Sequence, residues 1–357
     1  MPEKRIKQFL QNILFLLIGL TTAPCWAEKY DSSLEWKTYE TEHFVFHYDK
    51  NLRHLTERLA PKSEQVHKTL SEYFDWQPGE KTHVVLTDKI DATNGTATVM
   101  FSNSIVLYTS PPYEPFGLED FDNWLELVFI HEYTHILHLD MSGGLPKHLR
   151  WILGRFYLLF PNAFMPRWLV EGIATYIETD EKTDSGRGNS TYFRALMRME
   201  IENGFLSAGN VSQIMESWPG LTRWYLYGVY WFKFLEEKYG QDKIIELLKH
   251  QGSFPIPYLP DVGSWLALDK TLVSLWPEFE FYIQKQFSDE IATLKENQWQ
   301  AGENISESGY GNRNPIFIND KNLLYVANDG IDSSWLTRYD IEKKSHSRIR
   351  RVYGHRF

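Results

Sequence analysis

The chain has 357 residues, a length typical of two domains of unequal size. Apolar residues make up 43% of it and charged residues 24%, which excludes an intrinsically disordered chain, a collagen and a coiled coil. The formal net charge of −10 argues against nucleic-acid binding, because such proteins need a basic face to displace counterions from phosphates. The composition therefore predicts a globular protein with no nucleic-acid partner.

The first residues, 1–27, have the pattern of an export signal. Three cations near the start precede an apolar stretch over 13–20, and small residues follow. The apolar stretch is shorter than the roughly 20 residues that span a bilayer, so we expect cleavage, with a retained anchor as the alternative. The only cysteine, Cys25, lies in this segment. We therefore expect a thiol-free periplasmic or extracellular protein, whose metal ligands must be His and carboxylate side chains.

The apolar spacing predicts a small mixed sheet followed by a helical half. The expected strands are 34–48, 81–87 and 104–108, with a helix over 51–74 and a turn at Asn94-Gly95. A second helix runs through HEYTHILHLD and ends at Gly143-Gly144, and Pro166 begins the next one, WLVEGIATYIE. The clearest later helices are 225–239 and 243–250.

From Asn312 the pattern changes to four short strands separated by turns. Four short strands make about one blade of a β-propeller, and one blade cannot bury both of its faces alone. Either the chain begins a longer protein or this tail is poorly ordered. The predicted fold class is α+β, with one domain over 28–297 and the incomplete start of a propeller over 298–357.

His131 and His135 belong to an HExxH motif, the most informative segment of the sequence. Two His at i and i+4 lie on one helical face, so both imidazoles can reach one metal ion. Glu132 projects about 100° around the helix from His131, which lets it contact a bound water without being a ligand. The surrounding helix is strongly apolar, where three ionisable groups would be costly without partners. The alternative is that the two His are structural residues whose polar groups find partners within the fold.

Zinc in a hydrolase needs a third protein ligand and one open position. Glu171 is the best candidate, because it lies among apolar residues of its own helix and so should face inward. The alternative is a buried acid paired with Arg167 or Arg194. His138 lies nearly a turn beyond His135 and is interpreted as an outer neighbour or as core. Asp140 could orient a ligand imidazole or be a solvated helix-end acid.

HEYTH followed by WLVEGIATY resembles the gluzincin zinc peptidases of the peptidase MA-like superfamily, in which a second helix supplies a glutamate. Other segments resemble exported bacterial proteins that join a peptidase-like domain to a TolB-type β-propeller: NGTATVMFSNSIVLYTSPP, GRGNSTYF, WPGLTRWYLYG and EKYG. The resemblance covers about residues 30–350. It implies a gluzincin-like zinc peptidase fold with one Zn²⁺ on His131, His135 and Glu171, acting on a peptide or protein substrate. A protein partner for the propeller is a separate expectation, which belongs to the non-catalytic alternative given below.

The sequence departs from the best-known gluzincins in one respect, because 35 residues separate His135 from Glu171. The intervening segment 151–164 (WILGRFYLLFPNAF) is rich in bulky apolar residues. It could be a lid, a peripheral membrane-contacting loop or core. We expect core, the commonest fate of such side chains.

Peptide-bond hydrolysis is the predicted reaction, with Glu132 as the general base that activates a metal-polarised water. The resemblance points to Tyr225, with Tyr227 in reserve, as the hydroxyl that stabilises the oxyanion; both could equally be core aromatics. The strand 104–108, taken as a sheet edge, could hold substrate backbone. The rival is a non-catalytic envelope protein whose structural metal site is closed by a fourth ligand, His138 or Glu178. A zinc hydrolase acting on a substrate other than a peptide is a third reading.

Overall fold

The structure is a computed structural model that describes residues 33–90, 93–112, 123–213, 219–256, 258–296, 302–306 and 311–352. The chain divides into two compact units, Met1–Ser288 and Asp289–Phe357. The expected export signal lies outside the described residues, and the expected domain limits at 297 and 298 stay a prediction. Within the described ranges, no helix has both the length and the apolar character that crossing a membrane requires.

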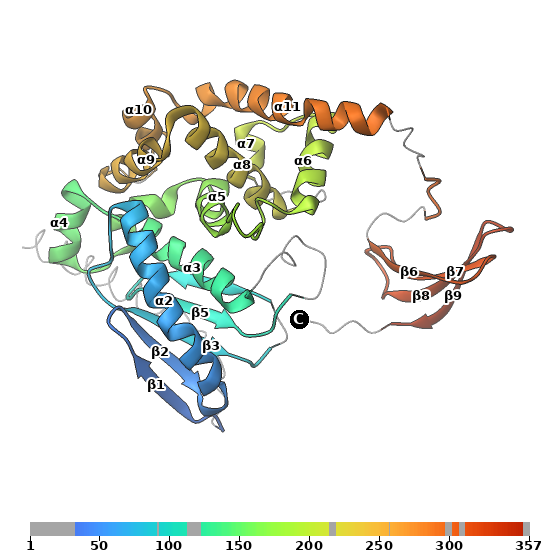
Figure 1. The fold of residues 1–357 in the computed structure, drawn as a ribbon, viewed down its shortest axis with the longest axis horizontal. Helices are drawn as coiled ribbons and strands as arrows, with labels where there is room; N and C mark the ends of the chain where they lie inside the picture. The colour runs from blue at the N-terminus through green and yellow to red at the C-terminus, as the bar shows by residue number, and fades with distance from the viewer. Residues whose placement is uncertain are drawn as a thin grey trace, which may run out of the picture. The chain divides into compact units, whose positions relative to one another are not determined.

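The first unit contains a five-stranded mixed sheet in the order β1-β2-β3-β5-β4 (Figure 1). The three central strands are parallel, and β1 and β4 are antiparallel edges. Alternating side chains on one face are fully buried under the helices: Phe44, Phe46, Val84, Leu86, Ile105 and Leu107. The strands are β1 (Trp36–Glu40), β2 (Phe44–Asp49), β3 (Thr82–Thr87), β4 (Gly95–Thr98) and β5 (Ser104–Tyr108).

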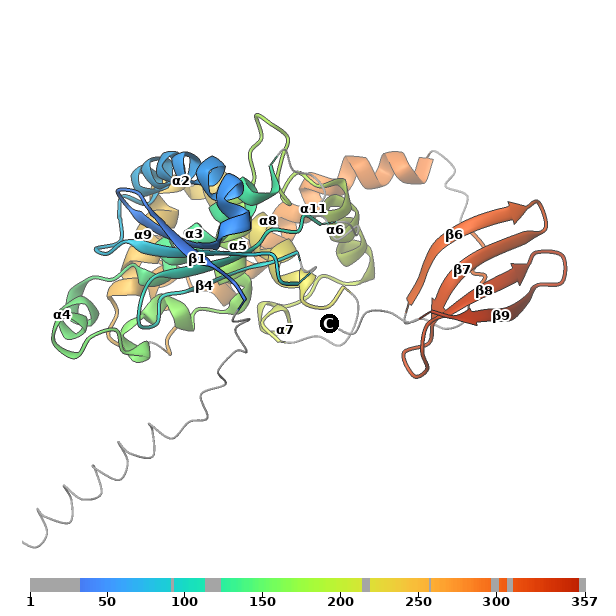
Figure 2. The same ribbon diagram turned by 90° about the horizontal axis from the view of Figure 1, so that it is seen from below.

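Helices cover this buried face and build the rest of the unit (Figures 1 and 2). The helix α2 packs on β2 and α3, while α3 packs on β4, β5 and α5. The helices and helical turns are η1 (Lys50–Leu52), α2 (Arg53–Phe74), α3 (Trp124–Asp140), α4 (Gly144–Leu153), η2 (Tyr157–Leu159), η3 (Pro161–Phe164), α5 (Arg167–Glu178), α6 (Thr191–Asn203), α7 (Ala208–Val211), α8 (Thr222–Tyr239), α9 (Gln241–Ser253), α10 (Val262–Leu268) and α11 (Leu272–Glu296).

Three expectations were wrong in detail. The strand expected over 34–48 is a hairpin of two strands, whose turn contains none of the Gly, Pro or Asn residues that signal one. The helix expected to end at Gly143-Gly144 ends at Asp140, and Gly144 instead opens α4. The segment 151–164 is core only in part, because its residues from Trp151 to Leu158 are mostly exposed while Leu159 and Phe160 are buried.

Two glycines allow α5 and α8 to cross closely. A Cβ atom on Gly172 would lie 2.5 Å from the Cα of Gly228, and one on Gly228 would lie 2.4 Å from the Cα of Gly172. Side chains at these two positions would force the helices apart. The crossing therefore fixes α8 against the helix that carries Glu171.

The second unit contains a four-stranded antiparallel sheet in the order β6-β7-β8-β9. Its small core holds Leu323, Tyr325 and Tyr339. The strands match the four expected short ones and are β6 (Gly311–Asn319), β7 (Asn322–Asn328), β8 (Trp335–Asp340) and β9 (Ser345–Arg351). The described residues of the second unit form this one sheet, so a complete propeller and its protein partner remain predictions.

Candidate metal centre

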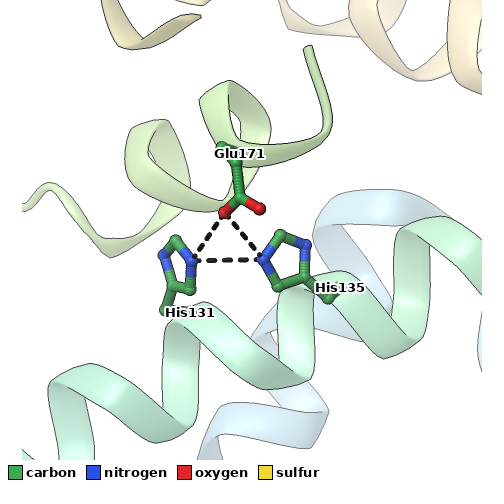
Figure 3. Close-up of side chains that lie close together, drawn as sticks. All are labelled: His131, His135 and Glu171. Atoms are coloured by element: carbon green, nitrogen blue, oxygen red, sulfur yellow. Dashed lines mark hydrogen bonds and ion pairs between the residues drawn. The ribbon is translucent and has the colours of Figure 1, made fainter. Parts of the chain in front are cut away.

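The helix α3 lies between the sheet and α5, and it is buried almost all round. His131 and His135 point from it toward the same side, one turn apart, with their Nε2 atoms 3.1 Å from each other (Figure 3). Both side chains are less than a tenth exposed. Their rings meet edge to face, with centroids 4.7 Å apart. The backbone therefore presents two ring nitrogens to one point, as the spacing of HExxH predicts.

Glu171 completes this group from α5, on the opposite side (Figure 3). Its Oε2 lies 3.5 Å from Nε2 of His131 and 3.3 Å from Nε2 of His135. Ligands placed about 2.05 Å from a tetrahedral zinc ion lie about 3.3 Å from one another. The three distances, 3.1, 3.3 and 3.5 Å, lie close to this edge length, and the group could hold one divalent cation.

The expected alternative for Glu171, an arginine partner, is also present. Arg167 Nε lies 3.1 Å from Oε1 of Glu171, one helical turn away. The Arg167 side chain is 61% exposed, so this ion pair is screened by solvent and weak. Because it uses Oε1, the pair leaves Oε2 directed at the two imidazoles. Arg194 lies elsewhere, over the ring of Phe287.

A buried carboxylate–arginine pair contacts His131 on the side of the ring opposite the candidate metal position. Nδ1 of His131 lies 2.8 Å from Oε2 of Glu178, at the last residue of α5. The Arg187 guanidinium clamps Glu178 with two hydrogen bonds, Nε to Oε1 at 2.6 Å and Nη2 to Oε2 at 2.8 Å. Burial raises the pKa of Glu178, but the Arg187 charge outweighs it and lowers this pKa to about 2. Nδ1 of His131 also lies 2.9 Å from Nη2 of Arg187, which can only donate, whereas the ionised Glu178 can only accept. In the tautomer in which Nδ1–H donates to Glu178, Nε2 keeps a lone pair for a cation.

The electrostatics of His131 also favour a cation. Burial and the charge of Arg187 lower its pKa, but hydrogen bonds to Glu171 and Glu178 outweigh them and raise it to about 9. Without another cation the site therefore takes up a proton. A divalent ion would satisfy the same carboxylates and displace that proton.

Glu132 faces a cavity of about 260 Å³ that adjoins the three ligands. Burial is the first cause of its raised pKa, which moves a carboxylate toward the range useful for proton transfer near neutrality. The edge strand β4 also lines this cavity through Gly95, Thr96 and Ala97, as does Asn94 just before it. The expectation that 104–108 is the edge was wrong, since β5 lies between β3 and β4.

Gly95 belongs to the candidate site through a close contact that the sequence did not reveal. A Cβ atom there would lie 2.7 Å from both Cγ and Oε1 of Glu132, and 2.8 Å from Cγ2 of Val128. Such contacts are too short for any side chain, so only glycine lets β4 approach the Glu132 carboxylate this closely. The strand edge and the expected general base are thereby held against each other.

The two tyrosine candidates occupy different places. Tyr225 lines the cavity, with its ring centroid 6.1 Å from that of His131 and the Arg187 guanidinium 4.3 Å from its own ring centroid. Burial raises the pKa of its hydroxyl, which therefore keeps its proton at neutral pH. Tyr227 is instead a fully buried core residue, donating to Glu200 and accepting from the Leu206 N–H.

The remaining candidates lie outside the ligand group. Burial lowers the pKa of His138 to about 3, and its Nε2 contacts the Met165 sulfur at 3.4 Å, so it is a neutral core histidine. Asp140 binds Arg150 and Arg155 rather than an imidazole. Nδ1 of His135 has no hydrogen-bond partner among the described residues. Because Glu178 contacts the far nitrogen of His131, neither proposed fourth ligand closes the site.

Comparison with known proteins identifies no family. No protein-family model matches the chain. A protein of Treponema pallidum (strain Nichols), described as uncharacterized, is 24% identical over 242 residues, which cover 67% of this chain and 21% of that protein. The chain thus spans about a fifth of the length of that relative.

A solved structure, an aminopeptidase N family protein from Idiomarina loihiensis, is 14% identical and covers 76% of this chain and 45% of its own. Its TM-score of 0.33 is too low to establish a shared fold. The candidate site therefore rests on its own geometry.

Proposed function

We propose that the protein is an exported zinc-dependent metallopeptidase that hydrolyses peptide bonds. The observation that carries this proposal is the tetrahedral spacing of the His131, His135 and Glu171 ligand atoms beside a cavity that Glu132 also lines. Three protein ligands with a vacant fourth direction are typical of catalytic zinc, whereas structural zinc is closed by four. Among the described residues, these three form the one group of His, Cys, Asp or Glu side chains whose ligand atoms lie close enough together to hold a metal ion.

The roles of the chain's own groups follow from their positions. A bound zinc ion would supply Lewis acidity and lower the pKa of a water molecule in the cavity. Glu132, with its raised pKa, would take a proton from that water and deliver it to the leaving amine. The Tyr225 hydroxyl would donate to the developing oxyanion. The outer edge of β4 would pair with the substrate backbone, since β5 occupies its other edge.

Metal removal tests the proposal directly. The purified protein should contain about one zinc ion per chain and cleave members of a mixed peptide library. Dialysis against a chelator should abolish cleavage, and stoichiometric zinc should restore it. Mass spectrometry of the peptides, with metal analysis of the same samples, measures both. A fully zinc-loaded protein that cleaves no peptide in the library would instead favour the structural-site alternative.

Substitution of Gly95 tests the position of β4. We expect Gly95→Ala to lower kcat/KM by about 100-fold, because the new methyl group must displace either the strand or the Glu132 carboxylate, and a misplacement of about 1 Å can cost that much. Zinc content should be unchanged, because no ligand moves. The matched control is Gly79→Ala, where an added Cβ would meet nothing within 4 Å. Equal activity of the two variants would remove β4 from the site.

A further inference from the structure

An exposed apolar surface lies on the first unit, outside the metal centre. It consists of Trp151, Ile152 and Leu153 at the end of α4, Phe156 and Tyr157 after it, and Tyr258 from a separate loop. Trp151 is 88% exposed, Ile152 67% and Tyr258 68%. Phe164 joins the two segments, since its ring lies 4.7 Å from that of Tyr157 and 4.9 Å from that of Tyr258. Phe164 thus links Tyr157 to Tyr258, and the exposed residues from Trp151 to Tyr157 are close neighbours in the chain, so the exposures are clustered rather than scattered.

The base of this surface is rigidly fixed. Asp140, at the end of α3, accepts from Arg150 Nη1 at 2.6 Å and from Arg155 Nη2 at 3.0 Å. Arg155 also donates through Nε to the Val99 carbonyl at 2.9 Å, just beyond β4. Both guanidinium groups lie over the ring of Phe160. Because buried ion pairs and a stacked ring hold the segment from beneath, its apolar side chains stay directed outward. Figure 2 shows α4 at the periphery of its unit.

The charge around the surface favours an anionic partner. The chain carries 47 acidic and 37 basic residues, yet no acidic residue occurs between Asp140 and Glu171. The loop 252–260, which contributes Tyr258, carries no charge. Lys147 and His148 lie exposed on α4, and Lys147 makes no ion pair with any described residue. An aromatic and aliphatic surface with adjacent cations, in an otherwise acidic chain, complements an anionic lipid surface.

We propose that this surface binds the interface of an anionic lipid bilayer, with Trp151 and its neighbours in the headgroup region and Lys147 beside the phosphates. Trp and Tyr favour that depth because their rings are apolar and their N–H and O–H groups remain solvated. Binding is peripheral, through side chains of a short helix and two loops. The proposal is independent of the peptidase proposal, because it is measured without substrate.

Vesicle sedimentation tests the proposal with the full chain and variants of identical N-terminus. The chain should bind vesicles of equimolar phosphatidylcholine and phosphatidylglycerol more tightly than vesicles of phosphatidylcholine alone. Trp151→Glu/Ile152→Glu should weaken binding at least about tenfold, because two inserted apolar side chains are lost. Lys147→Gln should weaken binding to the anionic vesicles by about fivefold and leave binding to neutral vesicles unchanged.

The matched control places the same charges on another exposed apolar pair. Val273 and Phe281 of α11 are 69% and 67% exposed, and Val273→Glu/Phe281→Glu should bind like the unmodified chain. Equal losses in the two double variants would show a general charge effect and overturn the proposal. So would absence of binding by the unmodified chain. A dimer in gel filtration that Trp151→Glu/Ile152→Glu converts to monomer would show that a second copy covers the surface, which also overturns it.

Discussion

Glu132→Gln should abolish peptide hydrolysis while leaving the metal in place. The substitution keeps the size of the side chain but removes the basic oxygen, and positioned general bases contribute about 10²–10⁴ to rates. Glu132 is not one of the three ligand residues, so zinc content should stay near one per chain. The measurement is kcat for a peptide substrate identified in the library, together with metal analysis of the same preparation.

The pH profile gives this variant a second readout. A carboxylate with a raised pKa acts as a base only above that pKa, so, under the proposed function, kcat/KM of the unmodified protein should fall as the pH drops through it. This fall in kcat/KM at low pH should be absent from any residual activity of Glu132→Gln. Gly79→Ala, whose added Cβ would meet no atom within 4 Å, should keep both the full rate and the fall at low pH. Undiminished turnover of Glu132→Gln would remove Glu132 from the mechanism.

Local periodicity could predict the ligand group because its geometry is local. An i, i+4 pair on a helix converges whatever surrounds it, and the apolar neighbours of Glu171 required that carboxylate to face inward. The same reasoning could have placed Glu178, which follows Glu171 by seven residues and so lies on the same stripe of α5. That spacing would have placed Glu178 two turns away from Glu171, where it can contact His131 without joining the ligand group.

Long-range features left no comparable signal. Arg187 reaches Glu178 through a loop whose course no periodicity describes, and its burial depends on that pairing. Gly95 appeared only as a turn residue, because its close contact with Glu132 depends on which strand forms the sheet edge. Strand order is decided by pairing across the sheet, which a single sequence does not contain. The expectation of an edge over 104–108 failed for this reason.

The apolar segment 151–164 shows a different limit. Its composition predicted burial, since large apolar side chains are usually core. In the structure Leu159 and Phe160 are buried while Trp151 and Ile152 are exposed. The change from exposed to buried side chains falls between Leu158 and Leu159, inside the short helical turn η2. Composition alone cannot show which half faces the core.

Glu171→Ala should remove the metal, whereas Glu178→Gln should only weaken its binding. Glu171 supplies one of three ligand atoms, and its loss leaves two imidazoles that cannot retain zinc against dialysis. Of the three candidate ligand residues, Glu178 contacts only His131, through its outer nitrogen Nδ1, and loss of such a supporting group typically costs about 10–100-fold in metal affinity. Competition with a chromogenic chelator measures both affinities.

Comparison of Glu171→Ala with Glu178→Gln distinguishes the metal ligand from the residue that only positions a ligand. Each removes one buried carboxylate from α5, so a general effect of losing a buried charge would appear in both. The loss of zinc should be complete only in Glu171→Ala, and Arg167→Gln, which removes the exposed partner of Oε1, should retain stoichiometric metal. If Glu171→Ala kept its zinc while Glu178→Gln lost it, the coordinating carboxylate would be Glu178 and the tetrahedral group would be misassigned. The open coordination position of the metal would then no longer face the cavity that Glu132 lines. The catalytic proposal would fail for that reason.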